Sequence, residues 1–476
     1  MTRMAGQIAQ FVRLNPAAGA LVFVALLCLL ILGLKIFSKR YAQHPELLRK
    51  LVHIGIGLTT LTFPWLFAAM WPVASIAVVS AALLMALKVP GPLRNLMGGV
   101  VDGVDRSSYG DLSFPIGVVT LFWLSQSGDA ATSKLLFCVP VLLLTLGDAV
   151  AALVGVKYGR HKFSTAEGMK SVEGSLACFA ASFLCTLLPL IAFARIGHVE
   201  ALLLAMILAL VAMMLEAIAW SGLDNLFLPL GGYALLKTHL GLSLKLLLAH
   251  AAATVALFLF ALAWRRRTSL NDSAVLGAAL YGYCAWSIGG PDWVYAPLFL
   301  FVGYPLMWPR TWRDAARTHT IGVVLAVGAA GLAWLFLFVA LQWKGALYAY
   351  NVAFAAQMAM IGLARLRHRY THMSGVIIVP TAIAVSWLLL IAPTLFASAL
   401  FANLVHFNSS AAFAFSAATQ VRGFSALAGI AVAAILFDRL RRDLRDYPCD
   451  PARWRLQAAL GALGSIVGVS PMLWGY

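Results

Sequence analysis

The sequence has few charged residues for its length. Only 11% of its 476 residues are charged, whereas 62% are hydrophobic, and the mean hydropathy is +0.88. A soluble domain carries about 25% charged residues, so this composition excludes a soluble enzyme. The apolar runs are continuous rather than alternating, which also excludes an outer-membrane barrel. The composition therefore predicts an all-α, polytopic integral membrane protein.

Cysteines and the familiar catalytic motifs are also sparse. The six cysteines form no CxxC pair and have no metal-type pairing with histidine, which argues against a disulfide framework or a zinc site. The sequence has no GxxxxGK(S/T) loop, no GxSxG turn and no HExxH helix. These absences exclude the usual ATP-binding loop, the hydrolases with a nucleophile elbow and the zinc proteases.

Acidic residues are fewer than basic ones. The 35 lysines and arginines exceed the 18 acids by 17. Most of the basic residues stand in short loops after apolar runs, which is the arrangement that orients membrane helices. No basic stretch is interleaved with aromatic residues, so we do not expect nucleic-acid binding. An anionic lipid or an anionic cytosolic substrate is the expected partner.

Apolar runs predict about 13 to 16 membrane spans, taking roughly 20 residues for each span. Basic clusters follow every second run, so the positive-inside rule places the end of each odd-numbered span in the cytoplasm. We expect a bacterial inner-membrane protein whose functional site faces the cytoplasm. The polar linker RRRTSLND begins at Arg265. It separates a motif-rich membrane domain, residues 1–264, from a second helical membrane domain, residues 265–476.

Two charged motifs precede the middle of the first domain. Arg49, Lys50 and His53 follow Glu46 at helical spacing, which predicts a cationic surface for phosphates. The alternative is an interfacial anchor whose side chains reach toward lipid headgroups. Arg106 lies in a glycine-rich loop that could offer backbone N–H groups and a cation to an anion. The alternative for this loop is a turn followed by a helix cap.

The strongest motif surrounds a carboxylate inside an apolar run. Asp148 begins the segment GDAVAALVGVKYGR, which ends with two cations, Lys157 and Arg160. A buried carboxylate beside a basic loop suits Mg²⁺ with a polyphosphate, because Mg²⁺ takes one or two carboxylates together with substrate phosphates. The segment KSVEGS starts at Lys170 and is expected to open the next helix, with its dipole directed at phosphate. The alternative is an intramembrane Asp–Lys pair that stabilises the bundle.

A further acid precedes a turn later in the same domain. Glu216 lies near the end of an apolar run, and Asp224 and Asn225 follow it, with Pro229 beyond them. Turn chemistry explains Asp224 and Asn225 without a functional role, but it does not explain Glu216. We expect Glu216 and this turn to provide further metal or nucleotide contacts.

Taken in order, these elements resemble the integral-membrane, CTP-dependent kinases of long-chain alcohols, the phytol kinase and dolichol kinase family. The matching segments are RKLVHIGIG, YGDLSFPIG, GDAVAALVGVKYGR, KSVEGS and the E…DN…P pattern, over about residues 40–240. The resemblance implies transfer of the γ-phosphoryl group of CTP to a membrane-embedded hydroxyl at the cytoplasmic face, with a divalent cation. The alcohol could be phytol, a polyprenol or diacylglycerol.

The resemblance and the charge pattern together give each residue an expected role. Such a transfer needs positioning and charge neutralisation rather than covalent help. The base that accepts the alcohol proton is either His53 or Glu173. The expected metal ligands are Asp148, Glu216 and Asp224. The expected catalytic residues are Asp148, Lys170, Glu173 and His53. The expected nucleotide contacts are Arg49, Lys50, Arg106, Lys157, Arg160, Ser171 and Asn225.

Two other functions compete with the kinase. A CDP-lipid synthase of the phosphatidate cytidylyltransferase type shares the GD…G…KS-EG layout, but its Pro-Gly-His-Gly-Gly signature is missing. A lipid transporter predicts charges near the midplane in both halves, whereas the acids gather in one half. Residues 265–476 carry no motif of the kinase family. We expect an accessory or second catalytic domain there, and whether the protein forms a homo-oligomer stays open.

Overall fold

The computed structural model confirms a helical membrane protein. It describes residues 11–13, 15–41, 45–88, 110–126, 128–165, 168–218, 222–264, 270–307, 319–370, 372–397, 417–440 and 451–473. Within these residues, ten helices are long and apolar enough to cross a membrane, and two shorter apolar segments accompany them. Several expected spans are helices of 13 to 16 residues, too short for that group. The chain divides into two compact units, Met1–Leu259 and Phe260–Tyr476.

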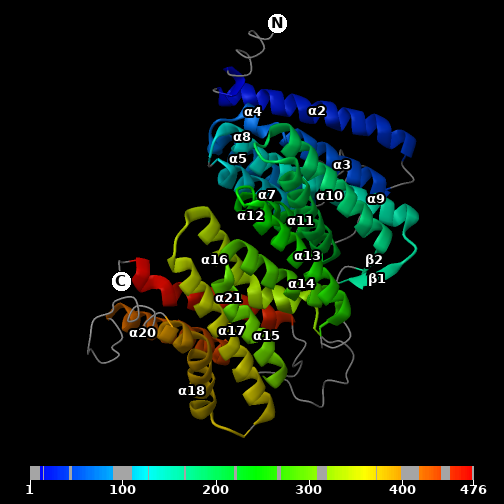
Figure 1. The fold of residues 1–476 in the computed structure, drawn as a ribbon. Coiled ribbons are helices and arrows are strands. Elements are labelled where there is room, and N and C mark those ends of the chain that lie inside the picture. The colour runs from blue at the N-terminus through cyan, green and yellow to red at the C-terminus, as the bar shows by residue number, and fades with distance from the viewer. Residues whose placement is uncertain are drawn as a thin grey trace. The chain divides into compact units, whose positions relative to one another are not determined.

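Unit 1 contains the motif-rich part of the chain (Figure 1). Its helices before the hairpin are α2 (Pro16–Tyr41), α3 (Pro45–Thr60), α4 (Phe63–Leu66), α5 (Met70–Lys88), α7 (Gly110–Ser125), α8 (Ala130–Leu142), the π-helical turn η1 (Leu143–Gly147) and α9 (Asp148–Tyr158). After the hairpin come α10 (Val172–Phe193), α11 (His198–Ile218), α12 (Asp224–His239) and α13 (Leu244–Trp264). The continuous helix α8–η1–α9 is central, because α3, α10 and α12 all pack against it.

A short antiparallel hairpin connects α9 to α10. Its strands are β1 (Lys162–Thr165) and β2 (Gly168–Ser171), paired in the register Lys162 to Ser171. This hairpin was not expected from the sequence. The expected helix start is correct, because α10 begins at the next residue, Val172. Helices α9 and α10 then approach closely, since a Cβ on Gly174 would lie 2.8 Å from the carbonyl oxygen of Ala151. The small residues of the motif therefore allow close packing of these helices.

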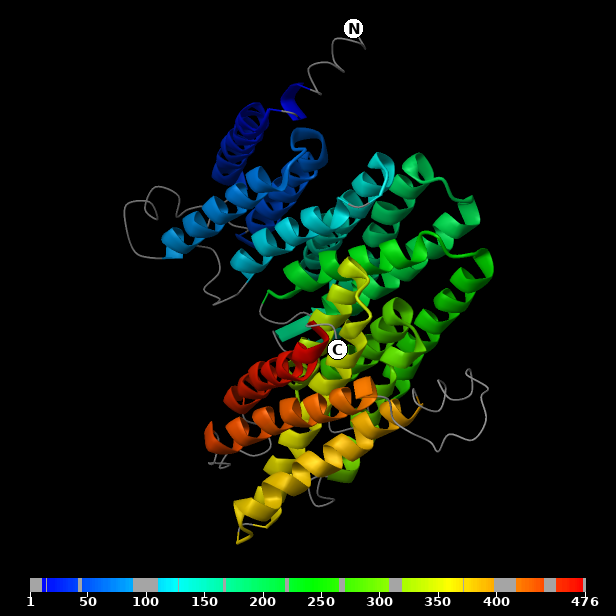
Figure 2. The same ribbon diagram turned by 90° about the vertical axis from the view of Figure 1, so that its left-hand side faces the viewer.

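Unit 2 is built around a single buried helix, α17 (Gly345–Arg369). Helices α16, α18, α20 and α21 pack against it, and α20 packs along α21, as Figure 2 shows in orange and red. The elements of unit 2 are α14 (Asp272–Cys284), η2 (Ala285–Gly289), η3 (Pro291–Trp293), α15 (Tyr295–Met307), α16 (Ile321–Leu341), α17, α18 (Gly375–Ser386), η5 (Trp387–Ile391), α20 (Ala417–Leu440) and α21 (Pro451–Leu473). A separate function for residues 265–476 stays a prediction.

Candidate active site

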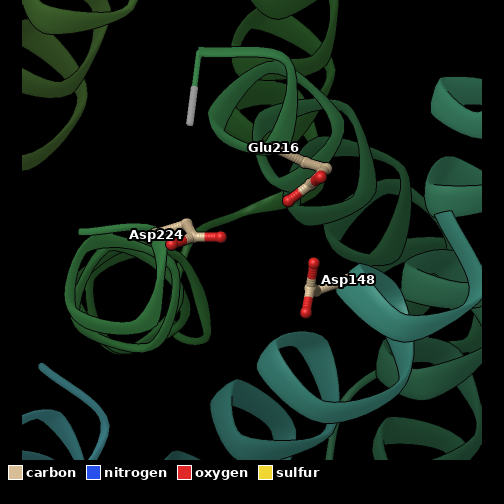
Figure 3. Close-up of side chains that lie close together, drawn as sticks. All are labelled: Asp148, Glu216 and Asp224. Carbon is tan, nitrogen blue, oxygen red and sulfur yellow. The ribbon is translucent and has the colours of Figure 1, made fainter. Parts of the chain in front are cut away.

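Three carboxylates from three helices meet in unit 1. Asp148 is the first residue of α9, Glu216 lies in the last turn of α11, and Asp224 is the first residue of α12. One oxygen of each carboxylate lies within 4.8 Å of the other two. Figure 3 shows the three side chains directed toward a common space. Asp148 and Glu216 are each only 7% exposed, so the cluster lies in the interior of the unit.

Two lysines from other elements bind these carboxylates. Lys50 of α3 is 3% exposed and donates to both oxygens of Asp148, at 2.8 Å and 2.7 Å. Lys170 of β2 donates to Oε1 of Glu216 at 2.6 Å and also to the backbone carbonyl of Glu216. Although burial alone would lower the pKa of Lys170, the attraction of Glu216 outweighs it and raises that pKa. The pair with Glu216 therefore favours the charged form of Lys170.

His53 lies one turn beyond Lys50 on α3 and faces the same cluster. Its Nε2 donates to the backbone carbonyl of Leu144, at 3.2 Å, and lies 3.6 Å from Oδ2 of Asp148. A carbonyl oxygen can only accept a hydrogen bond, so Nε2 carries the hydrogen and Nδ1 is left as the acceptor. Leu144 belongs to the π-helical turn η1, and such turns are frequent at functional sites. Leu144 could not be predicted from the sequence, because it contributes only its backbone carbonyl, which any residue has.

Ser171 and Glu173 connect the hairpin to the start of α10. The hydroxyl of Ser171 caps α10 by accepting from the backbone N–H of Gly174 at 3.1 Å. Glu173 accepts from the backbone N–H of Arg160 at 3.1 Å, and from Nδ1 of His161 at 2.7 Å. These bonds hold the loop that follows α9, so the contacts of Glu173 favour a positioning role over that of a base.

The remaining expected nucleotide contacts lie around this centre. Arg49, Lys157 and Arg160 are exposed. Asn225 donates from Nδ2 to the carbonyl of Gly110 at 3.2 Å, which fastens the start of α12 to the start of α7. Arg106 lies outside the described residues. The structure thus gathers six of the predicted site residues into one connected cluster: Lys50, His53, Asp148, Lys170, Glu216 and Asp224.

Comparison with known proteins shows which proteins share this part of the chain. A segment of 202 residues is 32% identical to a phytol kinase of Synechocystis sp.. This match covers 42% of this chain and 82% of that relative. The chain belongs to the isoprenoid-alcohol kinase family. Over 196 residues it is 31% identical to a chloroplastic farnesol kinase of Arabidopsis thaliana, covering 39% of this chain and 60% of that protein.

The kinase resemblance predicted from the sequence motifs is therefore confirmed. No family model matches the chain, and no solved structure does. Both relatives are matched over less than half of this chain.

The carboxylate cluster of this family member suits a divalent cation. Oε2 of Glu216 is buried and accepts no hydrogen bond, which is costly for a carboxylate oxygen unless a cation satisfies it. Mg²⁺ prefers oxygen ligands at about 2.0–2.1 Å, so opposite ligands in an octahedron lie about 4.2 Å apart. The three carboxylate oxygens lie up to 4.8 Å from one another, which is only slightly more than this distance between opposite ligands. The donor set and its spacing therefore fit Mg²⁺.

Proposed function

We propose that the protein transfers the γ-phosphoryl group of CTP to the hydroxyl of a long-chain isoprenoid alcohol, phytol or a polyprenol, at the cytoplasmic face of the membrane. The observation that carries the proposal is the convergence of three carboxylates with one buried lysine, Lys50, and one partly buried lysine, Lys170, in a chain whose relatives are phytol and farnesol kinases. Phosphoryl transfer depends on positioning and on neutralising the phosphate oxygens, and this cluster provides groups for both.

The carboxylates would hold the cation. Asp148, Glu216 and Asp224 offer hard oxygen ligands from three helices that are fixed by packing. A bound Mg²⁺ would supply neutralisation of the phosphate charge that develops during transfer. Because each ligand comes from a different helix, the site requires all three helices to be in place.

Lys50 and Lys170 would bind the triphosphate. Each ammonium is held by a carboxylate of the cluster, which fixes its position beside the expected phosphates. A fixed cation at this place stabilises the transition state without having to move when the reaction occurs. The start of α10, next to Lys170, adds the positive end of a helix dipole. Arg49, Lys157 and Arg160 would extend this cationic surface toward the solvent.

His53 would accept the proton of the alcohol. Its Nε2–H is engaged by the carbonyl of Leu144, so Nδ1 is available to receive a proton from a hydroxyl. Asp148, 3.6 Å from Nε2, would stabilise the imidazolium that results. Glu173 is the weaker candidate, because its carboxylate is occupied by the loop at Arg160 and His161.

Labelled CTP tests this function and separates it from the CDP-lipid synthase. We expect membranes containing the full chain to transfer label from γ-labelled CTP to the alcohol, in a panel of phytol, farnesol, a polyprenol and diacylglycerol. Label entering the lipid from the α position instead would assign the synthase reaction. Label in neither position would leave the transporter as the remaining alternative.

A matched pair of variants tests the metal site. Asp148→Asn should abolish transfer while the protein stays inserted and folded, because the amide is a poor ligand for Mg²⁺. Asp292→Asn makes the same chemical change at an exposed position of unit 2 and should leave the rate unchanged. Full activity of Asp148→Asn would refute the assignment of the metal ligands.

A further inference from the structure

A small polar cavity lies in unit 1 where α7 ends and α8 begins. Its volume is about 210 Å³, and its walls come from residues 11–13, α4, the end of α7 and the start of α8. Two cations, Arg13 and Lys134, line the cavity together with Gln126. No acidic residue is among the described residues that line it. The cavity therefore offers positive charge and hydrogen-bond donors to an anion.

The ammonium group of Lys134 is held at this cavity without an ion pair. Its Nζ lies 5.1 Å from the ring centroid of Trp65, which is a cation–π contact, and no described carboxylate forms an ion pair with it. The nearby acid, Asp129, caps α8 instead, because its side chain accepts from the backbone N–H groups of Ala131 and Thr132, at 3.2 Å and 3.5 Å. The charge of Lys134 is thus not neutralised by its own helix start.

The start of α2 brings the second cation to the same place. Gly19 of α2 packs on the end of α4, since a Cβ there would lie 2.7 Å from the carbonyl oxygen of Leu66. The chain just before α2 therefore runs beside α4, and Arg13 meets Pro64 and Phe67 in the wall of the cavity. Two cations from distant parts of the sequence consequently approach one cavity from different segments.

The longest apolar segment of unit 1 places the cavity at the level of lipid headgroups. Ala130–Tyr158 has 29 residues, or about 43 Å at 1.5 Å per residue. A bilayer with its headgroup regions is about 40–45 Å thick, so a span of this length reaches from one surface to the other. Asp148 lies about 27 Å beyond Ala130, which puts the cavity and the carboxylate cluster near opposite surfaces. Trp65 and Trp71 are 47% and 62% exposed, as is usual for tryptophans at a membrane interface.

We propose that this cavity binds the phosphate group of an anionic phospholipid such as phosphatidylglycerol. The cavity is smaller than the about 300–1,000 Å³ of pockets for drug-sized ligands, so it suits a headgroup phosphate rather than a whole nucleotide. The guanidinium of Arg13 can bind two phosphate oxygens at once, while Lys134 acts as a point charge. An anionic lipid is favoured over phosphatidylcholine, because the two cations would repel a choline group.

The simpler alternative is a lysine that reaches toward headgroups in general. Such an anchor needs neither a cavity nor a second cation from another segment, and both are present. The lipid site also uses none of the residues assigned to transfer from CTP, so it stands or falls independently of the proposed function.

Titration of the full-length protein in detergent with dioctanoyl phosphatidylglycerol, followed by native mass spectrometry, tests the proposal. We expect Lys134→Gln to weaken binding by at least about tenfold, as for the loss of a charge-assisted hydrogen-bonding group. Lys237→Gln is the matched control, because Lys237 also lies over an aromatic ring, Tyr233 at 5.5 Å, but does not line the cavity. It should weaken binding by less than about twofold. Equal weakening by both variants would overturn the proposal, because it would show attraction by net charge alone.

Two further variants protect the test against misfolding. Lys134→Arg keeps the charge and should bind within about threefold of the natural protein. Arg13→Gln removes the other cation from an exposed residue before α2, and should weaken binding by at least about threefold. Unchanged binding in both Lys134→Gln and Arg13→Gln would place the lipid elsewhere and overturn the proposal.

Competitors identify the source of the phosphate. We expect neither inorganic phosphate nor dioctanoyl phosphatidylcholine to displace the bound phosphatidylglycerol at equal concentration. Displacement by inorganic phosphate would overturn the lipid assignment, because it would show a site for a free ion. Displacement by phosphatidylcholine would overturn the preference for an anionic headgroup.

Discussion

Lys170 provides the sharpest test of the candidate active site, because one ammonium group is assigned to both folding and catalysis. Its Nζ makes two hydrogen bonds, to Oε1 and to the backbone carbonyl of Glu216. A hydrogen bond to a charged group contributes about 1.5–3 kcal/mol, which would give about 3–6 kcal/mol for two. The Lys170 side chain is 24% exposed, so solvent screening favours the lower end. We therefore expect Lys170→Met to lower the free energy of unfolding by about 3 kcal/mol.

The rate of phosphoryl transfer by Lys170→Met should fall by more than the loss of folded protein would explain. Removing one fixed group that stabilises developing charge costs about 10²- to 10³-fold in rate, so transfer from γ-labelled CTP should fall by that factor in the folded variant. Unfolding is measured by tryptophan fluorescence in detergent. The rate of label transfer is measured with saturating CTP and alcohol. Lys245→Met, at an exposed position of α13, serves as the matched control. A folded Lys170→Met protein with more than a tenth of the natural rate would refute the assigned role.

Three further changes test other parts of the argument. His53→Asn should lower kcat by about 10²- to 10⁴-fold and remove the acidic limb of the pH–rate profile. Glu173→Gln should lower kcat by less than about tenfold and keep that limb. A larger loss of kcat in Glu173→Gln than in His53→Asn would make Glu173 the base. Gly174→Ala should destabilise the protein by about 1–3 kcal/mol in thermal unfolding, because a Cβ there meets a backbone carbonyl. The control, Gly241→Ala, should have no steric cost, because no atom lies within 4 Å of a Cβ added at Gly241. The Asp129 carboxylate accepts hydrogen bonds at the start of α8, first of all from the side chain of Thr132, which lowers its pKa. Its contribution to stability is therefore present above its ordinary pKa and lost as the pH falls through the lowered value, so Asp129→Ala and the natural protein should differ in melting temperature at neutral pH and converge in strong acid.

The sequence identified the carboxylates more easily than their partners. Asp148 and Glu216 stand out because an acid inside an apolar run is costly, and a costly residue needs a reason. The partners could not be assigned, because Lys50 is 98 residues from Asp148 and Lys170 is 46 residues from Glu216. Many basic residues were available, and a single sequence does not say which of them the fold brings to a given acid.

Local structure shows the same division. Long apolar runs predicted the helices of the fold, since each must satisfy its own backbone within the membrane. The hairpin at residues 162–171 was not predicted, because its sequence, KFSTAEGMKS, has few of the β-branched and aromatic residues that favour strands. The π-helical turn at Leu143–Gly147 was not predicted either, because its apolar residues suit an α-helix equally well.

That π-helical turn gives the central span two separately phased halves. A π turn accommodates one more residue than an α-helical turn, so the residues after it are rotated by about 100° relative to an unbroken α-helix. Helix α8 packs against α12, α10, α7 and α3, whereas α9 packs only against α10 and α3 among the helices with several contacts to it. Deleting one residue from Leu143–Gly147 would leave a span of nearly the same length and hydropathy but turn Asp148 away from Lys50. The orientation of the site thus depends on a single extra residue in the middle of the apolar span Ala130–Tyr158, which hydropathy does not register.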